Sequence, residues 1–447
     1  MRFKIYISSL FFLLFSSLSL ATTVSSSKTD ANQQTSSLAY RSVVSSPFID
    51  IHLKTYGASD VLVNVSTMNE DLLLLQQIQD VENHLQTLGI TLENRRPIIE
   101  ISGKVESQIL AGNGFSGANS DINLSSTELD VHAMASEWAS AFMTINYDSS
   151  PPETGNRESN SRLYLQRGFL TLGNLNKLPV YITLGQMYVP FGAYNSYMVT
   201  TPLTMSLGRI QTRAGVLGFS SGNVFAQVYA FRGDSYIDDD QLLLDTFGGN
   251  IGFSGSAGFI SHYTIGVSYV SNIANSQGIQ NTGRGGNASN GNPFSGFSIN
   301  GSQALQTRVP AADINGKISM GPVTLVGEYL SAVNRFNAAD LRFNGQAAKP
   351  SAMHVEINYQ RRIYSKLVVF GAAYGQTWES LALNLPKQSY SLFLSSSFIK
   401  NTILGIEYRH DVNYASTDTG GGNGSTTDIR VTGRTRNLIT GQIGVYF

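Results

Sequence analysis

The 447-residue sequence contains no cysteine. Disulfide frameworks, cysteine-ligated zinc sites, thiol catalysis and the lipid-modified cysteine of a lipoprotein are therefore excluded. Charge is scarce as well, because Asp, Glu, Lys and Arg make up 14% of the residues, against about 25% in an ordinary soluble domain. The formal net charge is −1. The chain thus lacks the basic excess that nucleic-acid binding requires, and we expect no nucleic-acid partner.

Long apolar runs are missing after the N-terminus. No stretch of about 18 apolar residues follows it, which excludes a bundle of membrane-spanning helices. The sequence does contain 43 glycines, 23 phenylalanines and 21 tyrosines, and its hydropathy is close to neutral. Weak charge with abundant glycine and aromatics is typical of a large transmembrane β-barrel, in which alternate residues face lipid and water.

The N-terminus has the features of a secretory signal peptide. Arg2 and Lys4 precede an apolar stretch over 5–20, and Ser19 and Ala21 are small residues at the positions that signal peptidase reads. A membrane anchor would need a longer apolar run. We therefore predict that the signal peptide covers 1–21 and is removed after Ala21.

Two regions lie between the signal peptide and the strands. Segment 22–68 is expected to be disordered or irregular in the periplasm, since it begins rich in Ser, Thr and Gln. Segment 69–89 is expected to form a short periplasmic helix. Apolar residues recur there at spacings of 4, 3, 4 and 3, at Leu74, Ile78, Val81, Leu85 and Leu88. Because barely two heptads are present, an amphipathic helix packed on its own domain and a self-associating coiled coil both stay open.

From Ile98 onward the pattern changes to a period of two. In the first strand one face is uncharged and the other carries Glu100, Lys104 and Glu106. A soluble β-sandwich alternates in the same way. The pattern recurs in later strands without a charge on the apolar face, where Lys or Arg at mid-bilayer would cost about 2–4 kcal/mol. We therefore predict an all-β fold, a transmembrane antiparallel β-barrel over 98–447.

Connections of alternating length set the strand number. Eight long connections, expected outside the cell, lie near 111–120, 148–161, 189–212, 233–249, 273–310, 331–351, 377–387 and 411–428. Seven short ones, expected in the periplasm, lie near 136–137, 173–177, 221–222, 256–261, 321–322, 362–365 and 397–400. They join about sixteen strands, with fourteen or eighteen left open.

The last strand ends on the final residue of the chain. Ile439, Ile443, Val445 and Phe447 share one face of it. This pattern resembles the C-terminal signature by which bacterial outer-membrane barrels are delivered for assembly. Together with the signal peptide, it predicts the outer membrane of a Gram-negative cell, where lipids and lipopolysaccharide surround the barrel. We expect the last strand to pair with the first.

Charged residues on the inward faces are candidates for lining a water-filled lumen. These residues are Glu100, Lys104, Glu106, Asp130, His132, Asp313, Lys317, Glu328, His354 and Glu356. Sixteen strands leave an aqueous channel, and too few residues precede the strands to form a globular plug. We therefore expect an unplugged pore.

Two pairs on these faces raise the question of catalysis. Asp130 with His132, and His354 with Glu356, are i,i+2 neighbours, and a carboxylate that orients a histidine suits a nucleophile or a metal. No residue pattern locates that nucleophile, and polar side chains are expected wherever a strand faces water. We expect lumen lining, and no catalytic residue, metal or cofactor.

The connection after the fifth predicted strand is rich in aromatic residues. In porin-like barrels the third external loop commonly folds inward, which makes Tyr188, Phe191, Tyr194 and Tyr197 candidate constriction residues. The alternative is that they belong to the aromatic girdle at the membrane interface.

Several segments together resemble the LbtU family of siderophore porins. They are the signal peptide, the Leu/Gln-rich helix, Arg162-Leu-Tyr-Leu, Leu184-Gly-Gln-Met-Tyr-Val-Pro-Phe-Gly and Thr201-Pro-Leu-Thr. The resemblance implies uptake of a ferric siderophore, a polycarboxylate, or a similar small solute, through an outer-membrane barrel without a plug domain. It supplies no motif of binding residues. A structural or adhesive barrel that acts through its external loops is the alternative.

An anionic solute would need local basic residues. Arg430, Arg434 and Arg436 are spaced to share one side at the start of the last strand, near the external mouth. In an unbroken strand their even numbers point them into the lumen, where guanidinium suits carboxylate. A bulge at Gly433 would instead turn them toward lipopolysaccharide. Whether the protein is a monomer or a homo-oligomer stays open.

Overall fold

The computed structural model describes twelve stretches of the chain. These are residues 68–87, 98–114, 117–148, 162–235, 237, 243–281, 296–297, 304–364, 366–399, 401–423, 429–430 and 433–447. The predicted signal peptide over 1–21 and segment 22–67 lie outside the described residues, as does the end of the predicted helix at 88–89.

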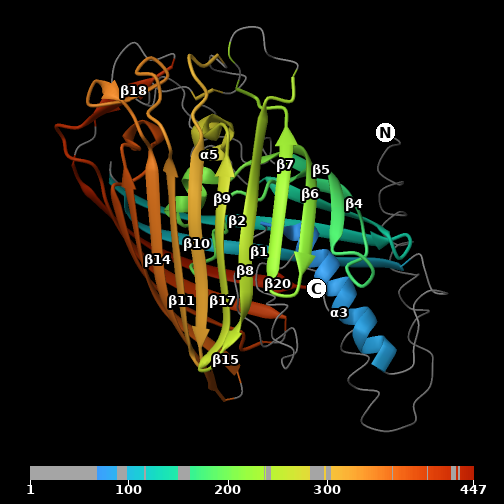
Figure 1. The fold of residues 1–447 in the computed structure, drawn as a ribbon. Helices are drawn as coiled ribbons and strands as arrows, with labels where there is room; N and C mark the ends of the chain where they lie inside the picture. Colours follow the sequence, from blue (N-terminus) through green and yellow to red (C-terminus); the bar gives the residue numbers. More distant parts are fainter. Residues whose placement is uncertain are drawn as a thin grey trace, which may run out of the picture. The chain divides into compact units, whose positions relative to one another are not determined.

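The described residues form a closed antiparallel barrel of sixteen strands (Figure 1). In order around the barrel these are β1 (Ile98–Gly114), β2 (Gly117–Met134), β3 (Ala139–Asp148), β4 (Arg162–Gly173), β5 (Val180–Tyr188), β6 (Gln211–Ser221), β7 (Val224–Phe231), β8 (Thr246–Ala257), β9 (Ile260–Val270), β10 (Ala311–Met320), β11 (Val323–Ala332), β14 (Ser351–Ile363), β15 (Lys366–Trp378), β16 (Gln388–Ser396), β17 (Thr402–Val412) and β20 (Thr435–Tyr446). The prediction of sixteen strands is confirmed.

The last strand closes the barrel against the first, as predicted. β20 pairs with β1 from Lys104 opposite Tyr446 to Asn113 opposite Asn437. One predicted connection is wrong, however. β1 and β2 stay paired up to Gly114 opposite Gly117, so no long connection separates these strands near 111–120. Small and polar residues there continue the strands because cross-strand pairing supplies their backbone hydrogen bonds.

Side chains alternate between the lumen and the outer surface. In β7, Gln227 is 2% exposed and its neighbour Val228 is 58% exposed. The same alternation puts Ile99 and Ile101 outside and Lys104 and Glu106 inside. An outer surface of exposed Ile, Leu, Val, Phe and Tyr requires lipid around it, because burial in lipid removes that apolar area from water.

The two ends of the barrel differ in their connections. At the short-turn end, β6 joins β7 through Gly222 and β10 joins β11 through Gly321. Both glycines have positive φ, 59° and 55°, a conformation that glycine adopts without the cost of a Cβ clash. At the opposite, long-loop end, the connections carry structure of their own.

A small sheet stands at the long-loop end, where Figure 1 labels β18. Its strands, in the order β13-β12-β18-β19, are β12 (Leu341–Phe343), β13 (Gln346–Ala347), β18 (Thr419–Gly422) and β19 (Ile429–Arg430). It joins the β11–β14 connection to the β17–β20 connection. Arg430 therefore lies in this sheet, paired with Thr419, and not in the last strand as expected.

Five short or medium helices complete the described residues. They are α3 (Glu70–Thr87), α4 (Leu203–Gly208), η5 (Ile273–Asn275), α5 (Gln277–Asn281) and η7 (Leu381–Leu383). Among the described helices, none is both long and apolar enough to cross a membrane. The helix expected over 69–89 is thus present as α3, but its first turns lie inside the barrel and not in the periplasm, for reasons given below.

Candidate functional site: the lumen and its inward-folded loop

The connection between β5 and β6, residues 189–210, folds into the lumen. A carboxylate on the opposite wall holds its first part. Glu328, on β11, accepts hydrogen bonds from the backbone N–H groups of Ala193 (2.8 Å) and Tyr194 (2.9 Å) through Oε1. Its Oε2 accepts one from the hydroxyl of Thr204 (2.5 Å). One side chain therefore fixes two separate points of the loop.

A second glutamate holds the middle of the loop. Glu356, on β14, accepts the N–H of Tyr197 (2.8 Å) and the hydroxyl of Ser196 (2.7 Å). His354 contacts the same carboxylate at 3.0 Å, so the predicted His354–Glu356 pair is formed. Both oxygens of Glu356 accept hydrogen bonds from the loop, so the His354–Glu356 pair holds the loop in position.

A third glutamate, which the sequence analysis did not single out, holds the next part. Glu407, on β17, accepts the N–H of Thr200 (2.8 Å) and its hydroxyl (2.7 Å). Arg409, two residues further on the same face, donates to Thr200 Oγ1 (3.2 Å). The sequence signal for Glu407 and Arg409 is that they alternate with apolar residues in β17, which places both on the lumen face. Hydrogen bonds to a charged acceptor contribute about 1.5–3 kcal/mol each, so the three glutamates form a strong loop latch.

The four aromatic candidates lie inside the barrel. Tyr188, Phe191, Tyr194 and Tyr197 are all buried, whereas aromatic residues on the outer surface, such as Phe247 and Tyr269, are exposed. Lys317, a predicted lumen residue of β10, lies over the ring of Tyr197 at 5.7 Å from its centroid. The structure thus places these aromatics with the inward-folded loop and away from the lipid-facing surface.

A water-accessible cavity of about 240 Å³ lies beside the loop. The strands β1, β2, β4, β16, β17 and β20 supply the other wall. Its polar lining includes Lys104, Glu106, Gln108, Glu128, Gln166, Tyr188, Tyr194, Tyr197, Arg209 and Gln442. We call it the lumen cavity. Amide and phenol groups make up most of this polar lining, so the cavity offers both hydrogen-bond donors and hydrogen-bond acceptors.

The charges of the lumen cavity are paired. Lys104 lies opposite Glu128 across β1 and β2 and contacts it at 3.2 Å, and it contacts Glu106 at 3.5 Å. Glu106 also accepts hydrogen bonds from Gln442 (2.9 Å) and from the hydroxyl of Tyr446. Opposite-charge cross-strand pairs stabilise a sheet. Glu128 was not singled out from the sequence, although its alternation with Asp130 gave a signal.

Arg209 stands on the loop side of the same cavity. Its guanidinium lies over the ring of Tyr188, 4.7 Å from the centroid, and its Nε donates to Gln277 of α5 (2.9 Å). The connection between β9 and β10 therefore helps to hold the loop. Arg209 has no signal in the sequence, because a single arginine at a loop end belongs to no periodic pattern.

The other predicted acid and histidine positions are engaged within the barrel wall. Asp130 accepts a hydrogen bond from Thr144 (2.6 Å), and His132 Nδ1 faces Glu100 at 3.4 Å. Asp313 is buried and accepts from Asn315 (2.6 Å). The geometry thus directs Asp130 and His132 to separate partners, unlike the i,i+2 pair considered from the sequence.

The three predicted arginines do not share one surface. Arg436, on β20, pairs with Asp411, which also accepts from Arg409 Nε (2.8 Å). Arg434 is exposed and precedes β20, and Gly433 before it has a φ of 66°. Because this backbone turn lies between Arg430 and β20, the parity count that placed all three on one side is wrong.

Curated proteins of two bacteria are similar to this chain over most of its length. No family model matches the chain. A UPF0422 protein of Legionella pneumophila strain Philadelphia 1 is 36% identical over 427 residues, covering 93% of this chain and 78% of the relative. A UPF0422 protein of Coxiella burnetii strain RSA 493 is 35% identical over 398 residues, covering 88% of this chain and 81% of the relative.

Two solved structures are similar to the barrel. OmpF of Salmonella typhi, solved as a complex with daunomycin, has a TM-score of 0.50 at 10% identity, covering 79% of this chain and 99% of that chain. The outer-membrane channel DcaP of Acinetobacter baumannii has a TM-score of 0.49 at 11% identity, covering 78% and 97%. The OmpF likeness shows a porin-type barrel, and the identity to its curated relatives shows that the chain belongs to the UPF0422 family.

Proposed function

We propose that the protein is a porin-like channel of the Gram-negative outer membrane that passes a small solute through its lumen. The observation that carries this proposal is the loop latch, in which Glu328, Glu356 and Glu407 hold residues 189–210 inside the barrel beside a polar cavity. A barrel with only a structural role has no need of a shaped, hydrated interior. The short-turn end then faces the periplasm and the long-loop end the outside.

The solute class follows from two supports. The resemblance to the LbtU family points to a ferric siderophore, and Arg209, which lies over the ring of Tyr188, gives the lumen cavity a cationic group for an anionic cargo. The cavity of about 240 Å³ is smaller than the roughly 300–1,000 Å³ of pockets that hold drug-sized ligands. Passage of a siderophore therefore requires movement of a segment that narrows the lumen.

Reconstitution in a planar lipid bilayer tests the channel. We expect stepwise ion conductance and a reversal potential in a salt gradient that reports anion preference. Protein that was boiled before reconstitution is the control. Correctly folded barrels without any conductance would contradict the proposal.

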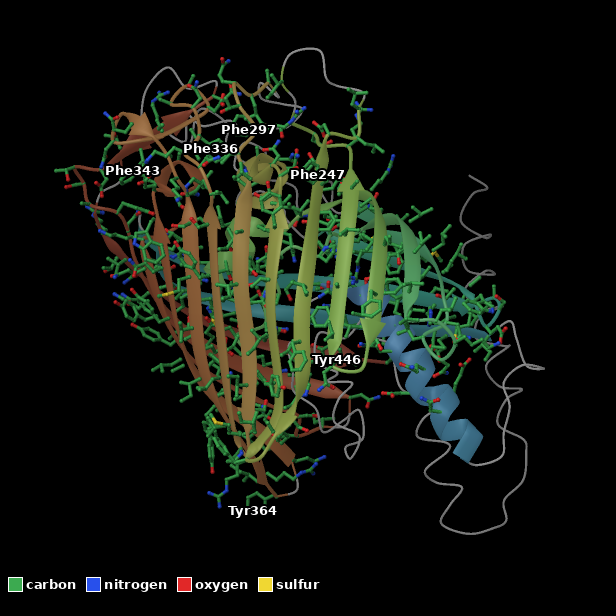
Figure 2. All side chains as sticks on the ribbon, in the orientation of Figure 1. Phe247, Phe297, Phe336, Phe343, Tyr364 and Tyr446 are labelled. Carbon is green, nitrogen blue, oxygen red and sulfur yellow. The ribbon has the colours of Figure 1, made fainter. Side chains whose placement is uncertain are left out.

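The long-loop end favours a second candidate, an adhesive barrel. Arg335 donates to both oxygens of Glu379 (2.7 and 3.1 Å) beside a cleft of about 410 Å³ that includes Phe343 and Asn344. Figure 2 shows Phe343 at the end opposite Tyr364. An ordered external platform suits partner contact. The bilayer measurement separates the two candidates, because an adhesive barrel does not conduct.

A further inference from the structure

The N-terminal turns of α3 are buried in the barrel. Met68, Glu70, Asp71, Leu72, Leu74 and Leu75 are all buried. Met68 and Leu74 belong to the same apolar cluster as Phe142 and Phe169, and Leu72 and Leu75 pack with Tyr181. Phe142, Phe169 and Tyr181 alternate with exposed residues in their strands, so they face the lumen. The seat of the helix is therefore the barrel interior.

Polar contacts give the direction of the helix. Asn69 accepts a hydrogen bond from Asn250 of β8 (3.3 Å), and Gln76 donates to Ser220 (3.5 Å) near the β6–β7 turn. Further along, Glu82 accepts from Asn176 (3.0 Å) in the β4–β5 turn. The helix thus leaves the barrel at the short-turn end, and Figure 1 shows it in blue with one end among the strands.

A buried ion pair fixes the tip of the helix. Arg167 of β4 is 0% exposed, and its Nη1 donates to Glu70 Oε1 at 2.5 Å. Its Nη2 lies 3.5 Å from Glu128 and 3.8 Å from Asp130. Arginine donates to carboxylates with a geometry that few side chains match. The contact with Glu70 is the shortest that Arg167 makes.

This ion pair adjoins the lumen cavity. Glu128 lines the cavity and contacts Lys104 at 3.2 Å, and the same carboxylate faces Arg167 through its other oxygen. The tip of α3 is thus linked to the wall of the lumen cavity through Arg167 and Glu128. Lys104 and Arg167 are neighbouring cations on either side of the Glu128 carboxylate.

The seat of the helix is incompletely satisfied. Oε2 of Glu70, Oδ2 of Asp71, Nε of Arg167 and Oε1 of Gln227 are buried and have no hydrogen-bond partner in the protein. A buried polar atom without a partner is unfavourable. Displacement of the helix would expose these atoms to water.

We propose that α3 is a built-in gate of the lumen and that Arg167 is its carboxylate site. Glu70 occupies this site in the closed channel, and a carboxylate of an anionic solute takes its place as the channel opens. The inference rests on the proposed channel function. It also supplies the movement that the small lumen cavity requires.

A reversible cross-link tests the gate. The chain has no cysteine, so Asn69→Cys with Asn250→Cys introduces the sole thiols at two short side chains that share a hydrogen bond of 3.3 Å, and a disulfide between them ties the tip of α3 to β8. We expect the oxidised channel to stay closed and a reductant to open it, with the two single-cysteine variants insensitive to reductant. Equal conductance of oxidised and reduced channels overturns the gate and leaves the channel function standing. Folded channels that never conduct overturn both.

A second experiment tests the carboxylate site. Glu70→Gln leaves the barrel wall intact, and we expect it to raise the open fraction about tenfold, which corresponds to ~1.4 kcal/mol. Glu82→Gln is the matched control. Glu82 lies on the same helix and contacts Asn176 in the β4–β5 turn, and we expect its replacement to leave the open fraction unchanged. An equal response of Glu70→Gln and Glu82→Gln overturns the role of Glu70.

Citrate supplies the competing carboxylate in the same bilayer. We expect it to raise the open fraction of the wild-type channel from the long-loop side. Arg167→Gln should be open without citrate and gain nothing from it. An equal proportional effect of citrate on both channels overturns the assignment of Arg167. Resistance to unfolding in an unheated gel verifies that Arg167→Gln has closed its barrel.

Discussion

The hydroxyl of Tyr446, in the last strand, donates a hydrogen bond to the carboxylate of Glu106, in the first strand. The two residues are 340 positions apart and meet inside the lumen, where Gln442 and Lys104 contact the same carboxylate. This contact reinforces the backbone pairing that closes the barrel. It also fixes one of the charged groups that line the lumen cavity.

Replacing Tyr446 with Phe should destabilise the closed barrel. The variant removes one donor from a buried carboxylate, and we expect a loss of about 1–3 kcal/mol, measured by denaturant unfolding in detergent. Tyr364→Phe is the matched control, since Tyr364 is 95% exposed in the β14–β15 turn (Figure 2). We expect that control to lie within about 0.5 kcal/mol of the wild type. Equal stability of the two variants would argue against the role of Tyr446.

Removing one part of the loop latch should widen the pore. Glu356→Ala leaves the N–H of Tyr197 and the hydroxyl of Ser196 without their acceptor, at a cost of about 1–3 kcal/mol for each unsatisfied group. We expect larger and noisier single-channel conductance. Glu379→Ala, which affects the external loops, is the control. Wild-type conductance in Glu356→Ala would show that the loop does not narrow the passage.

The final residue is expected to matter for assembly. Phe447 exchanges two backbone hydrogen bonds with Gly103, at 2.9 and 3.0 Å, and its ring lies so close to Gly103 that a Cβ there would clash. Deleting Phe447 should lower the amount of heat-modifiable barrel in the outer membrane. Phe447→Ala keeps the backbone hydrogen bonds with Gly103 and removes only the ring. This variant therefore separates the contribution of the ring from that of the backbone pairing. Normal levels of the deleted form would count against the terminal signature.

The external loops should hold together better at lower pH. Asp340 accepts hydrogen bonds from the N–H of Gln306 (3.1 and 3.0 Å), and burial raises the pKa of Asp340 above its ordinary value of 3.8. The Asp340 carboxyl therefore binds its proton more tightly in the folded loops than in the unfolded chain. The resulting contribution to the stability of the loops is complete below pH 3.8 and is lost as the pH rises through the raised pKa.

Hydrogen exchange at the Ala348 amide, which donates to Leu341 next to Asp340 (3.0 Å), measures this effect. After correction for the intrinsic exchange rate, we expect its protection to fall as the pH rises from 3.8 through the raised pKa of Asp340. Asp340→Asn removes the titrating group and should remove this fall. The same pH dependence in Asp340→Asn would assign it to another residue.

Several predictions from the sequence rested on local rules and were confirmed. Ile99 faces outward and Lys104 faces inward because a strand places successive side chains on opposite faces. The rule fails where a bulge intervenes. Between β3 and β4 the register shifts at Thr144 and Ile145, which leaves Gln166 as an extra residue and places it in the lining of the lumen cavity. Counting alternate positions along the sequence cannot detect such an extra residue.

The sequence by itself therefore determined the barrel, its strand order and the sorting of apolar and charged residues, because a period of two and turn composition are local properties. The partners of the charged residues were decided by the tertiary structure. Glu328 and Glu356 could be placed in the lumen from alternation, but their hydrogen bonds reach backbone groups 134 to 159 residues away. Arg167 meets Glu70 across 97 residues. Such contacts depend on how a closed barrel brings distant strands, a loop and a helix into one enclosed space, and no local pattern encodes that proximity.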